Sequence, residues 1–153
     1  MSYDVVRDPL RSASDLRAML TVERVSHAWD GATSTAHVQV RSDSALGWMS
    51  IRWQADARVV QIFTPLSGPV PEAAGDRVRA LLLRVNHALA IGSLGLDPTS
   101  GVAYARLALP LQPDGSLCPA LLRACFARVG ALVDDFVPTI AAAIAGAPST
   151  DPT

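Results

Sequence analysis

Residues 84–109 read RVNHALAIGSLGLDPTSGVAYARLAL, and this stretch decides the fold because the hydrophobic pattern changes on both sides of it. Upstream, apolar side chains recur every three or four positions, as on one face of a helix. These side chains belong to Val78, Leu81, Leu82, Val85 and Leu89. The run Asp97-Pro-Thr-Ser-Gly101 is a strong turn signal, and residues 102–111 alternate between apolar and other side chains. The pattern predicts a helix, a β-hairpin and then a second helix.

Capping residues set the expected ends of these two helices. Pro71 suits a first helical turn, so we expect a helix over 71–90. Cys118 is the expected N-cap and Pro119 the first residue of a last helix that runs to Gly146. Pro138 lies inside that helix and should kink it or split it, because proline removes one backbone hydrogen bond and clashes with the preceding turn. Strands are expected over 93–96 and 102–111.

The first half of the chain predicts a short helix followed by a meander. Ser12 or Ser14 can cap a helix that extends to about residue 25. Residues 25–30 form either a short edge strand or a connector. Strands are expected over 34–41, 46–54 and 59–66, and the short turns between them require antiparallel pairing. The element order is therefore α-β-β-β-α-β-β-α, an α+β fold with helices packed on a single antiparallel sheet.

Length and composition indicate one globular domain over residues 1–153, with 1–10 and 147–153 loosely ordered. The chain has 50% apolar and 18% charged residues and a net charge of −1, so bulk charge attracts neither nucleic acid nor a membrane. The first residues lack a basic segment followed by an apolar one. We therefore expect a soluble protein of the cytoplasm.

No set of residues in the sequence indicates catalysis. The chain has no P-loop, nucleophile elbow or dinucleotide fingerprint. His27, His37 and His87 fall on a connector, a strand and a helix end, so we expect no metal and no cofactor. Asp134 and Asp135 point about 100° apart on a helix and cannot share a proton, so a solvated pair is expected. We expect a protein that is not an enzyme.

Three polar residues in suggestive places have structural interpretations. The Asn86 amide is expected to bind main chain at the corner between helix and strand, rather than a ligand. Asp97 is expected to shape the turn at Pro98. Cys118 could be a reactive thiol, but no base or resolving cysteine is placed beside it. A helix separates the Cα atoms of Cys118 and Cys125 by about 10 Å, which is too far for a disulfide and suits a reducing compartment.

Several short motifs carry a family resemblance. They are Val85-Asn86, Leu94-Gly-Leu-Asp97, Tyr104, Leu107–Leu111, Gly115-Ser-Leu-Cys-Pro119 and Asp134-Asp-Phe-Val-Pro138. With the element order, they make the chain resemble the YbjN-like family of bacterial sensory transduction regulators. That family more often has Ser where Cys118 stands. Its fold is similar to that of type III secretion chaperones, which are small acidic homodimers that bind a segment of a partner protein.

The resemblance implies a homodimeric protein-binding regulator or chaperone-like adaptor, with the stress response as a candidate setting. For dimerisation it favours the edge of the hairpin and the middle helix, since an uncovered edge strand is a liability.

Strand alternation indicates where a partner would bind. One face of the sheet is expected to carry His37, Gln39, Arg41, Trp48, Arg52, Gln61, Phe63, Tyr104 and Arg106. Arginine and exposed aromatic residues are enriched where proteins meet partners. The candidate partner-binding residues are Arg41, Trp48, Arg52, Phe63, Tyr104 and Arg106. Two alternatives stay open: the face binds single-stranded nucleic acid by stacking, or the first helix or a dimer mate simply covers Trp48 and Phe63.

Overall fold

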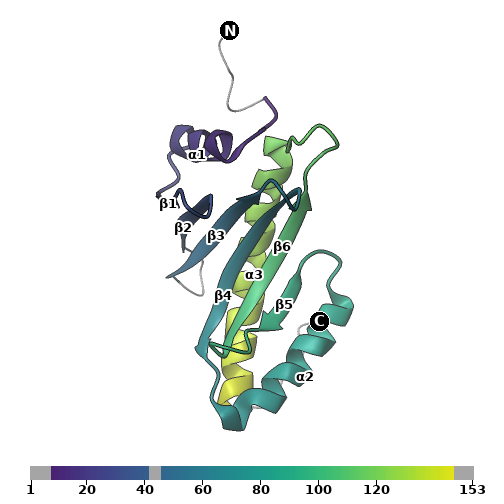
Figure 1. The fold of residues 1–153 in the computed structure, drawn as a ribbon. Coiled ribbons are helices and arrows are strands. Elements are labelled where there is room, and N and C mark those ends of the chain that lie inside the picture. Colours follow the sequence, from purple (N-terminus) through teal and green to yellow (C-terminus); the bar gives the residue numbers. More distant parts are fainter. Residues whose placement is uncertain (1–7, 42–45, 147–153) are drawn as a thin grey trace.

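The computed structural model describes residues 8–41 and 46–146. The order of elements is α1 (Ala13–Val22), β1 (His27–Asp30), β2 (Thr35–Arg41), β3 (Leu46–Gln54), β4 (Val59–Pro69), α2 (Glu72–Ala88), β5 (Ser93–Leu96), β6 (Val102–Pro110) and α3 (Pro119–Ala145). The strands form one antiparallel sheet in the order β1-β2-β3-β4-β6-β5. In Figure 1, α3 lies behind the sheet along its length, α1 lies at one end, and α2 runs beside β5. The expected fold class is confirmed.

Local chemistry explains where the helices begin and end. Ser12 caps α1 by accepting a hydrogen bond from the Asp15 backbone N–H. Cys118 occupies the N-cap of α3 and Pro119 its first turn, where the missing N–H costs nothing. The same helix ends at Gly146 in the left-handed conformation with φ = 74°.

The hydrophobic core lies between the three helices and one face of the sheet. Alternation along β3 buries Met49, Ile51 and Trp53 on that face, and the other long strands follow the same rule. Leu16 and Leu20 of α1 and Leu122 of α3 are buried against these side chains. An ion pair between Glu23 and Arg123, with Nε donating over 2.7 Å, joins the end of α1 to α3. All three helices therefore contribute to one continuous core.

The structure decides several alternatives that the sequence left open. Residues 27–30 form a short edge strand. The strand expected over 59–66 continues to Pro69. It pairs with β6 in register from Val59 to Pro65 and again at Pro69, with a register shift between these two prolines. Pro138 does not split α3, which runs as one element from Pro119 to Ala145.

The expected loose lead over residues 1–10 is wrong at Leu10. That side chain is fully buried, and its backbone pairs with Leu117 over 2.9 and 2.8 Å. Residues 1–7, the expected turn at 42–44 and the expected tail at 147–153 lie outside the described residues. Within the described ranges, no helix is both long enough and apolar enough to cross a bilayer.

Candidate functional site

The sheet face opposite the helices carries the residues expected there. Cross-strand register places Gln39 beside Trp48, and Arg52 beside Gln61. It also aligns His37, Ser50, Phe63 and Arg106 in one row across β2, β3, β4 and β6. This outer face is turned toward the viewer in Figure 1 and has no helix on it. We call this surface the outer sheet face.

Aromatic side chains form the centre of the outer sheet face. The rings of Phe63 and Tyr104 lie 4.8 Å apart between centroids and are tilted by 32°. A Cβ atom at Gly95, which pairs with Tyr104, would overlap the Tyr104 ring, so the ring depends on a glycine in β5. Trp48 is 55% exposed. The first helix therefore does not cover Trp48, contrary to one of the alternatives drawn from the sequence.

The charges on this face are few. Arg52 and Arg106 are exposed, and His37 shares a 3.0 Å hydrogen bond with Ser50 through its Nδ1. The side chain of Arg41 lies outside the described part of the chain. The structure therefore brings five of the six candidate partner-binding residues onto one surface: Trp48, Arg52, Phe63, Tyr104 and Arg106.

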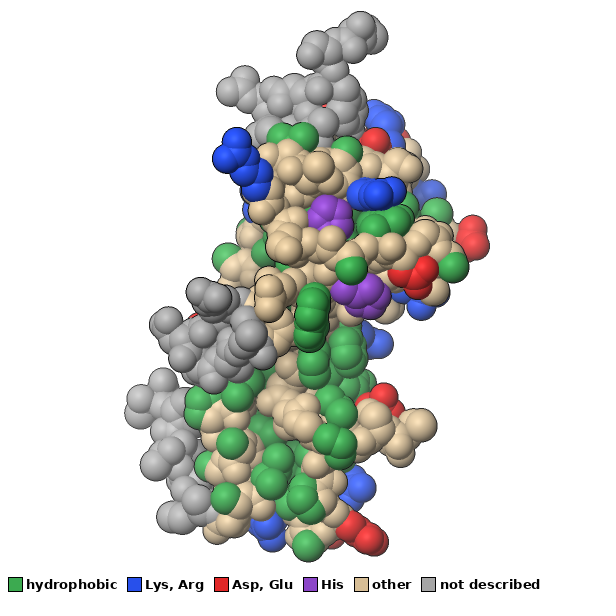
Figure 2. Space-filling model, turned by 90° about the vertical axis from the view of Figure 1, so that its left-hand side faces the viewer, with side chains coloured by type: hydrophobic (Ala, Val, Ile, Leu, Met, Phe, Trp, Pro, Cys, Tyr) green, Lys and Arg blue, Asp and Glu red, His purple; other side chains and the backbone are tan. Residues whose placement is uncertain are grey.

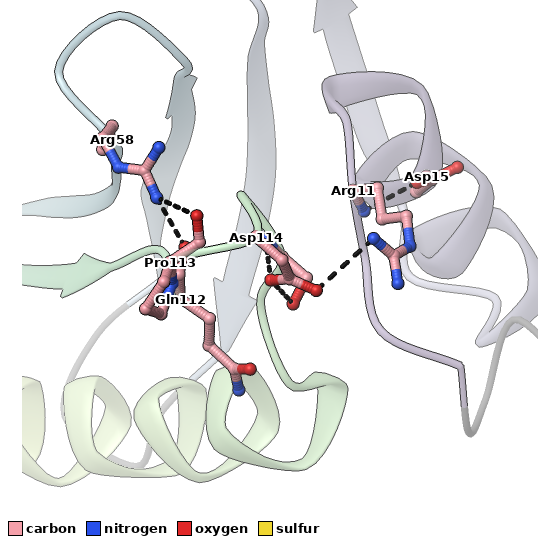
Figure 3. A network of polar contacts seen from close by, with 7 residues as sticks. Arg11, Asp15, Arg58, Gln112, Pro113 and Asp114 are labelled. Atoms are coloured by element: carbon pink, nitrogen blue, oxygen red, sulfur yellow. Dashed lines mark hydrogen bonds and ion pairs between the residues drawn. The ribbon is translucent and has the colours of Figure 1, made fainter.

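Two other arginines, Arg58 and Arg11, bind residues of the loop between β6 and α3 (Figure 3). Arg58 donates through Nη2 to the backbone oxygens of Gln112 and Pro113, over 2.7 and 2.9 Å. Arg11 lies 3.4 Å from Asp114, and its backbone N–H donates to Asp15. Hydrogen bonds from the side chain and backbone of Ser116 lower the pKa of Asp114. These arginines fix the loop between β6 and α3 and are not part of a basic patch.

A groove opens where β3 leaves β4. The register between the two strands ends at the pair Ser50–Phe63, while β4 continues beside β6 to Pro69. The space between them is a hollow of about 290 Å³, lined by Val40, Gly47, Trp48, Thr64, Pro65, Leu66, Ser67, Val133 and Val137. We call this hollow the β3–β4 groove. Trp48 borders both the groove and the outer sheet face.

The sequence interpretation missed this groove. The signal present in the sequence is Pro65, which lies near the end of the strand expected over 59–66 and has no N–H. The position of the groove also depends on α3, because Val133 and Val137 form its wall. Hydrophobic side chains gather over the lower half of the molecule on this side, with charged side chains at the rim (Figure 2).

The other edge of the sheet is closed by Asn86. Its amide nitrogen donates to the Leu94 backbone oxygen, and its amide oxygen accepts from the Leu94 N–H, both over 2.7 Å. The side chain thus occupies the position that a further strand would take beside β5. Next to it, a shallow hollow lined by Leu82, Leu83, Leu94 and Leu96 lies between α2 and β5.

The remaining residues singled out from the sequence lie apart from one another. Asp97 accepts hydrogen bonds from the Thr99 and Ser100 N–H groups, and these bonds lower its pKa. Cys118 is exposed at the start of α3. Pro138 lies near the other end of the same helix. The hollow that Asn86 lines is lined by neither Asp97 nor Cys118.

The described residues contain few groups suited to chemistry. No three His, Cys, Asp or Glu side chains within residues 8–41 and 46–146 are placed to hold a metal ion. Burial raises the pKa of Cys125 and so disfavours its thiolate. Asp135 is exposed, and Asp134 is half-buried rather than fully solvated.

Comparisons with known proteins give a family match and two structures with a similar fold. Residues 12–142 match the family model YbjN, described as "Putative bacterial sensory transduction regulator". The crystal structure of YbjN, "a putative transcription regulator from E. coli", is similar with a TM-score of 0.65 and 12% identity, covering 86% of this chain and 90% of that chain. A chain of the HopA1–SchA chaperone–effector complex is similar with a TM-score of 0.54 and 17% identity, covering 77% and 85%. No curated protein matches the chain.

The structural likenesses establish the fold, and the expected likeness to secretion chaperones is confirmed. The family is described as a regulator and not as a class of enzyme. Because the family model spans most of the sequence, the chain belongs to the YbjN family.

Proposed function

We propose that this chain is a non-enzymatic, homodimeric regulator or chaperone-like adaptor that binds a partner protein through its outer sheet face. The observation that carries the proposal is the 55% exposure of Trp48 on the sheet face that also carries the Phe63–Tyr104 pair and has no helix on it. A tryptophan left in water loses the stabilisation that burial would supply, so its burial in a complex is favourable. Arg52 and Arg106 flank these rings and can pair with carboxylates of the partner.

The proposed dimer uses α2 and β5. Leu83 of α2 is 74% exposed and Ile91, just beyond this helix, is 60% exposed. Leu83 lines the hollow between α2 and β5 together with Leu82, Leu94 and Leu96. Ile91 lies in the connection from α2 to β5. Because Asn86 already bonds the β5 main chain, the two copies would meet through side chains and not through a continuous sheet. A cytoplasmic location and a role in the stress response, both implied by the resemblance, complete the proposal.

The partner is tested by capturing the tagged protein from its native bacterium. We expect one partner protein to be retained by the wild type and lost from a variant with Trp48→Ala and Arg106→Glu. Leu121→Glu, at a 47% exposed position on α3, is the matched control and should retain the partner. Equal retention by all three proteins, or by none, contradicts the proposal.

The dimer is tested by light scattering on the purified protein. The wild type should have twice the chain mass, and Leu83→Glu should convert it to a monomer, because a charge would be buried at the centre of the interface. Leu121→Glu should remain dimeric. A monomeric wild type, or a dimer that tolerates Leu83→Glu, contradicts this arrangement.

A single-stranded nucleic acid is the weaker alternative for the outer sheet face. Stacking on Phe63, Tyr104 and Trp48 would suit bases, but Arg52 and Arg106 are the arginines that the described residues place there. Few phosphate contacts produce little affinity at physiological salt. Fluorescence anisotropy with a labelled oligonucleotide at low and high salt decides this, and we expect no binding at either.

A further inference from the structure

Pro65 creates the β3–β4 groove by removing one donor from the sheet. In an antiparallel ladder, the N–H and C=O of a residue face the same neighbouring strand, and the side alternates along the chain. The Leu94 groups face away from β6, because both bond Asn86. Following the register from Leu94 to Ala105 and Thr64 directs the backbone groups of Phe63 and Pro65 toward β3. The next pair after Ser50–Phe63 would be Trp48–Pro65, and proline has no N–H to donate.

A side chain takes over the hydrogen bond that Pro65 cannot make. The Trp48 backbone oxygen accepts a 3.0 Å hydrogen bond from the Thr64 hydroxyl. Thr64 is 2% exposed, so this bond is shielded from water. It satisfies the Trp48 carbonyl, which lies next to the last paired residues of β3, and from there β3 and β4 separate. The separation of β3 from β4 is therefore specified by Pro65 and Thr64, and it is not fraying at a strand end.

The opened stretch has the chemistry of a strand edge beside an apolar wall. Beyond Phe63, the described residues show β4 paired on the β6 side alone. The lining that the described residues give to the groove next to it is uncharged and includes Val40, Leu66 and Val137. Val40 also lines a second hollow of about 260 Å³, whose other walls include Val38, Met49 and Phe126. The two hollows therefore adjoin, and they form an elongated apolar surface between the sheet and α3.

These features select one kind of occupant. Polar backbone at a strand edge is complementary to an extended chain, which supplies main-chain donors and acceptors. The uncharged lining disfavours charged side chains, because burying an unpaired charge is costly. Successive hollows suit alternate apolar side chains of such a chain. Trp48 makes the groove continuous with the outer sheet face, where the partner is proposed to bind.

We propose that the β3–β4 groove is the docking site for an extended, uncharged, apolar-alternating segment of the partner protein, which adds to β4 as a strand. The inference rests on the proposed function and specifies the part of the partner that is recognised. The second copy of this chain is not the occupant, because the proposed dimer uses the opposite edge of the sheet.

The test uses synthetic peptides as the probe. A set of end-capped peptides of about eight residues, the length of an ordinary strand, alternates Val, Leu or Ile with Thr or Ser and carries a fluorophore. We expect at least one peptide to bind below about 1 mM by anisotropy, and to slow amide exchange at Ser67, whose N–H is the next after Pro65 to face the groove in the alternation. The same peptide with N-methyl groups along one edge should bind about tenfold more weakly or not at all, because it loses its main-chain donors. No binding by any member, or equal binding by the N-methylated form, overturns the proposal.

Two variants of the protein locate the binding. Pro65→Val restores a donor at an exposed position, so β3 can close onto β4, and peptide affinity should fall about tenfold or more. Val137→Glu places a carboxylate in the groove wall and should have the same effect. Leu121→Glu, elsewhere on α3, is the control and should bind like the wild type. Unchanged binding by Pro65→Val, whose folding is not at risk, overturns the proposal even if Val137→Glu unfolds.

The outcome separates this inference from the proposed function. If Trp48→Ala with Arg106→Glu abolishes capture of the native partner while Pro65→Val leaves capture intact, the outer sheet face binds the partner and the groove does not. If no variant affects capture, the proposed function itself is wrong. If both sets of variants abolish capture, the partner occupies the face and the groove together.

Discussion

Replacing Asn86 by alanine tests how the second half of the fold is held together. The variant removes one donor and one acceptor, each 2.7 Å from the Leu94 backbone. Each such bond contributes about 0.5–1.5 kcal/mol net, so losing both costs about 2 kcal/mol. Alanine recovers about 0.5 kcal/mol because it is the better helix former and position 86 lies within α2. We expect the free energy of unfolding to fall by about 1–2 kcal/mol.

Urea titration followed by circular dichroism measures this loss. The slope of the transition should stay constant, since the surface exposed on unfolding is unchanged, and amide exchange at Leu94 should become faster. Asn86→Asp should cost more than Asn86→Ala at neutral pH, because a carboxylate oxygen would face the Leu94 carbonyl. His87→Ala, at the exposed neighbouring position, is the matched control and should change stability by less than about 0.5 kcal/mol. A loss for Asn86→Ala no larger than that of His87→Ala would refute the reasoning.

Three further outcomes follow from individual contacts. Arg77 donates to the Ala143 and Ile144 carbonyls at the end of α3, over 3.0 and 3.3 Å, so Arg77→Ala should lower the free energy of unfolding by about 1 kcal/mol in urea titration. A thiol reagent should modify one cysteine per native chain, exposed Cys118, and reach buried Cys125 only on unfolding; rapid reaction of both would contradict the packing of α3. Hydrogen bonds from the Thr99 and Ser100 N–H groups lower the pKa of Asp97 below the ordinary value for an aspartate, so its contribution to stability is present above that ordinary value and is lost as the pH falls through the lowered pKa. Asp97→Asn should therefore reduce the loss of stability in acid below about pH 4, and an unaltered pH profile would count against these bonds.

Sequence periodicity predicted the elements that bury a long stripe. The middle and last helices, α2 and α3, and the strand pair around Asp97 were expected almost at their observed bounds, because apolar spacing and capping residues act locally. The outer sheet face was predicted for the same reason, since alternation assigns each strand residue to one side. Asn86 was assigned to main-chain binding because its amide can both donate and accept.

The features that the sequence did not predict depend on which strand, helix or distant residue a given side chain or backbone group faces in the folded structure. Pro65 lies near the end of the strand expected over 59–66, but its missing N–H affects only the β3 side, and β4 continues beside β6 to Pro69. Pro138 stays within α3 because Phe136 and Ile140, on either side of it, are buried in the core. Leu10 is buried through pairing with Leu117, more than a hundred positions away, which no local pattern reveals. The groove arises from such long-range geometry and is therefore absent from the sequence pattern.

The bond between Asn86 and Leu94 also limits self-association. A protein polymerises through its sheets when each copy offers two open edges, because every copy can then join one neighbour on each side. Here the Asn86 amide saturates the middle of the β5 edge, and β1 at the other end of the sheet is only four residues long. Head-to-tail growth through the two ends of the sheet is therefore disfavoured, because one end is saturated at Leu94 and the other offers only a short edge.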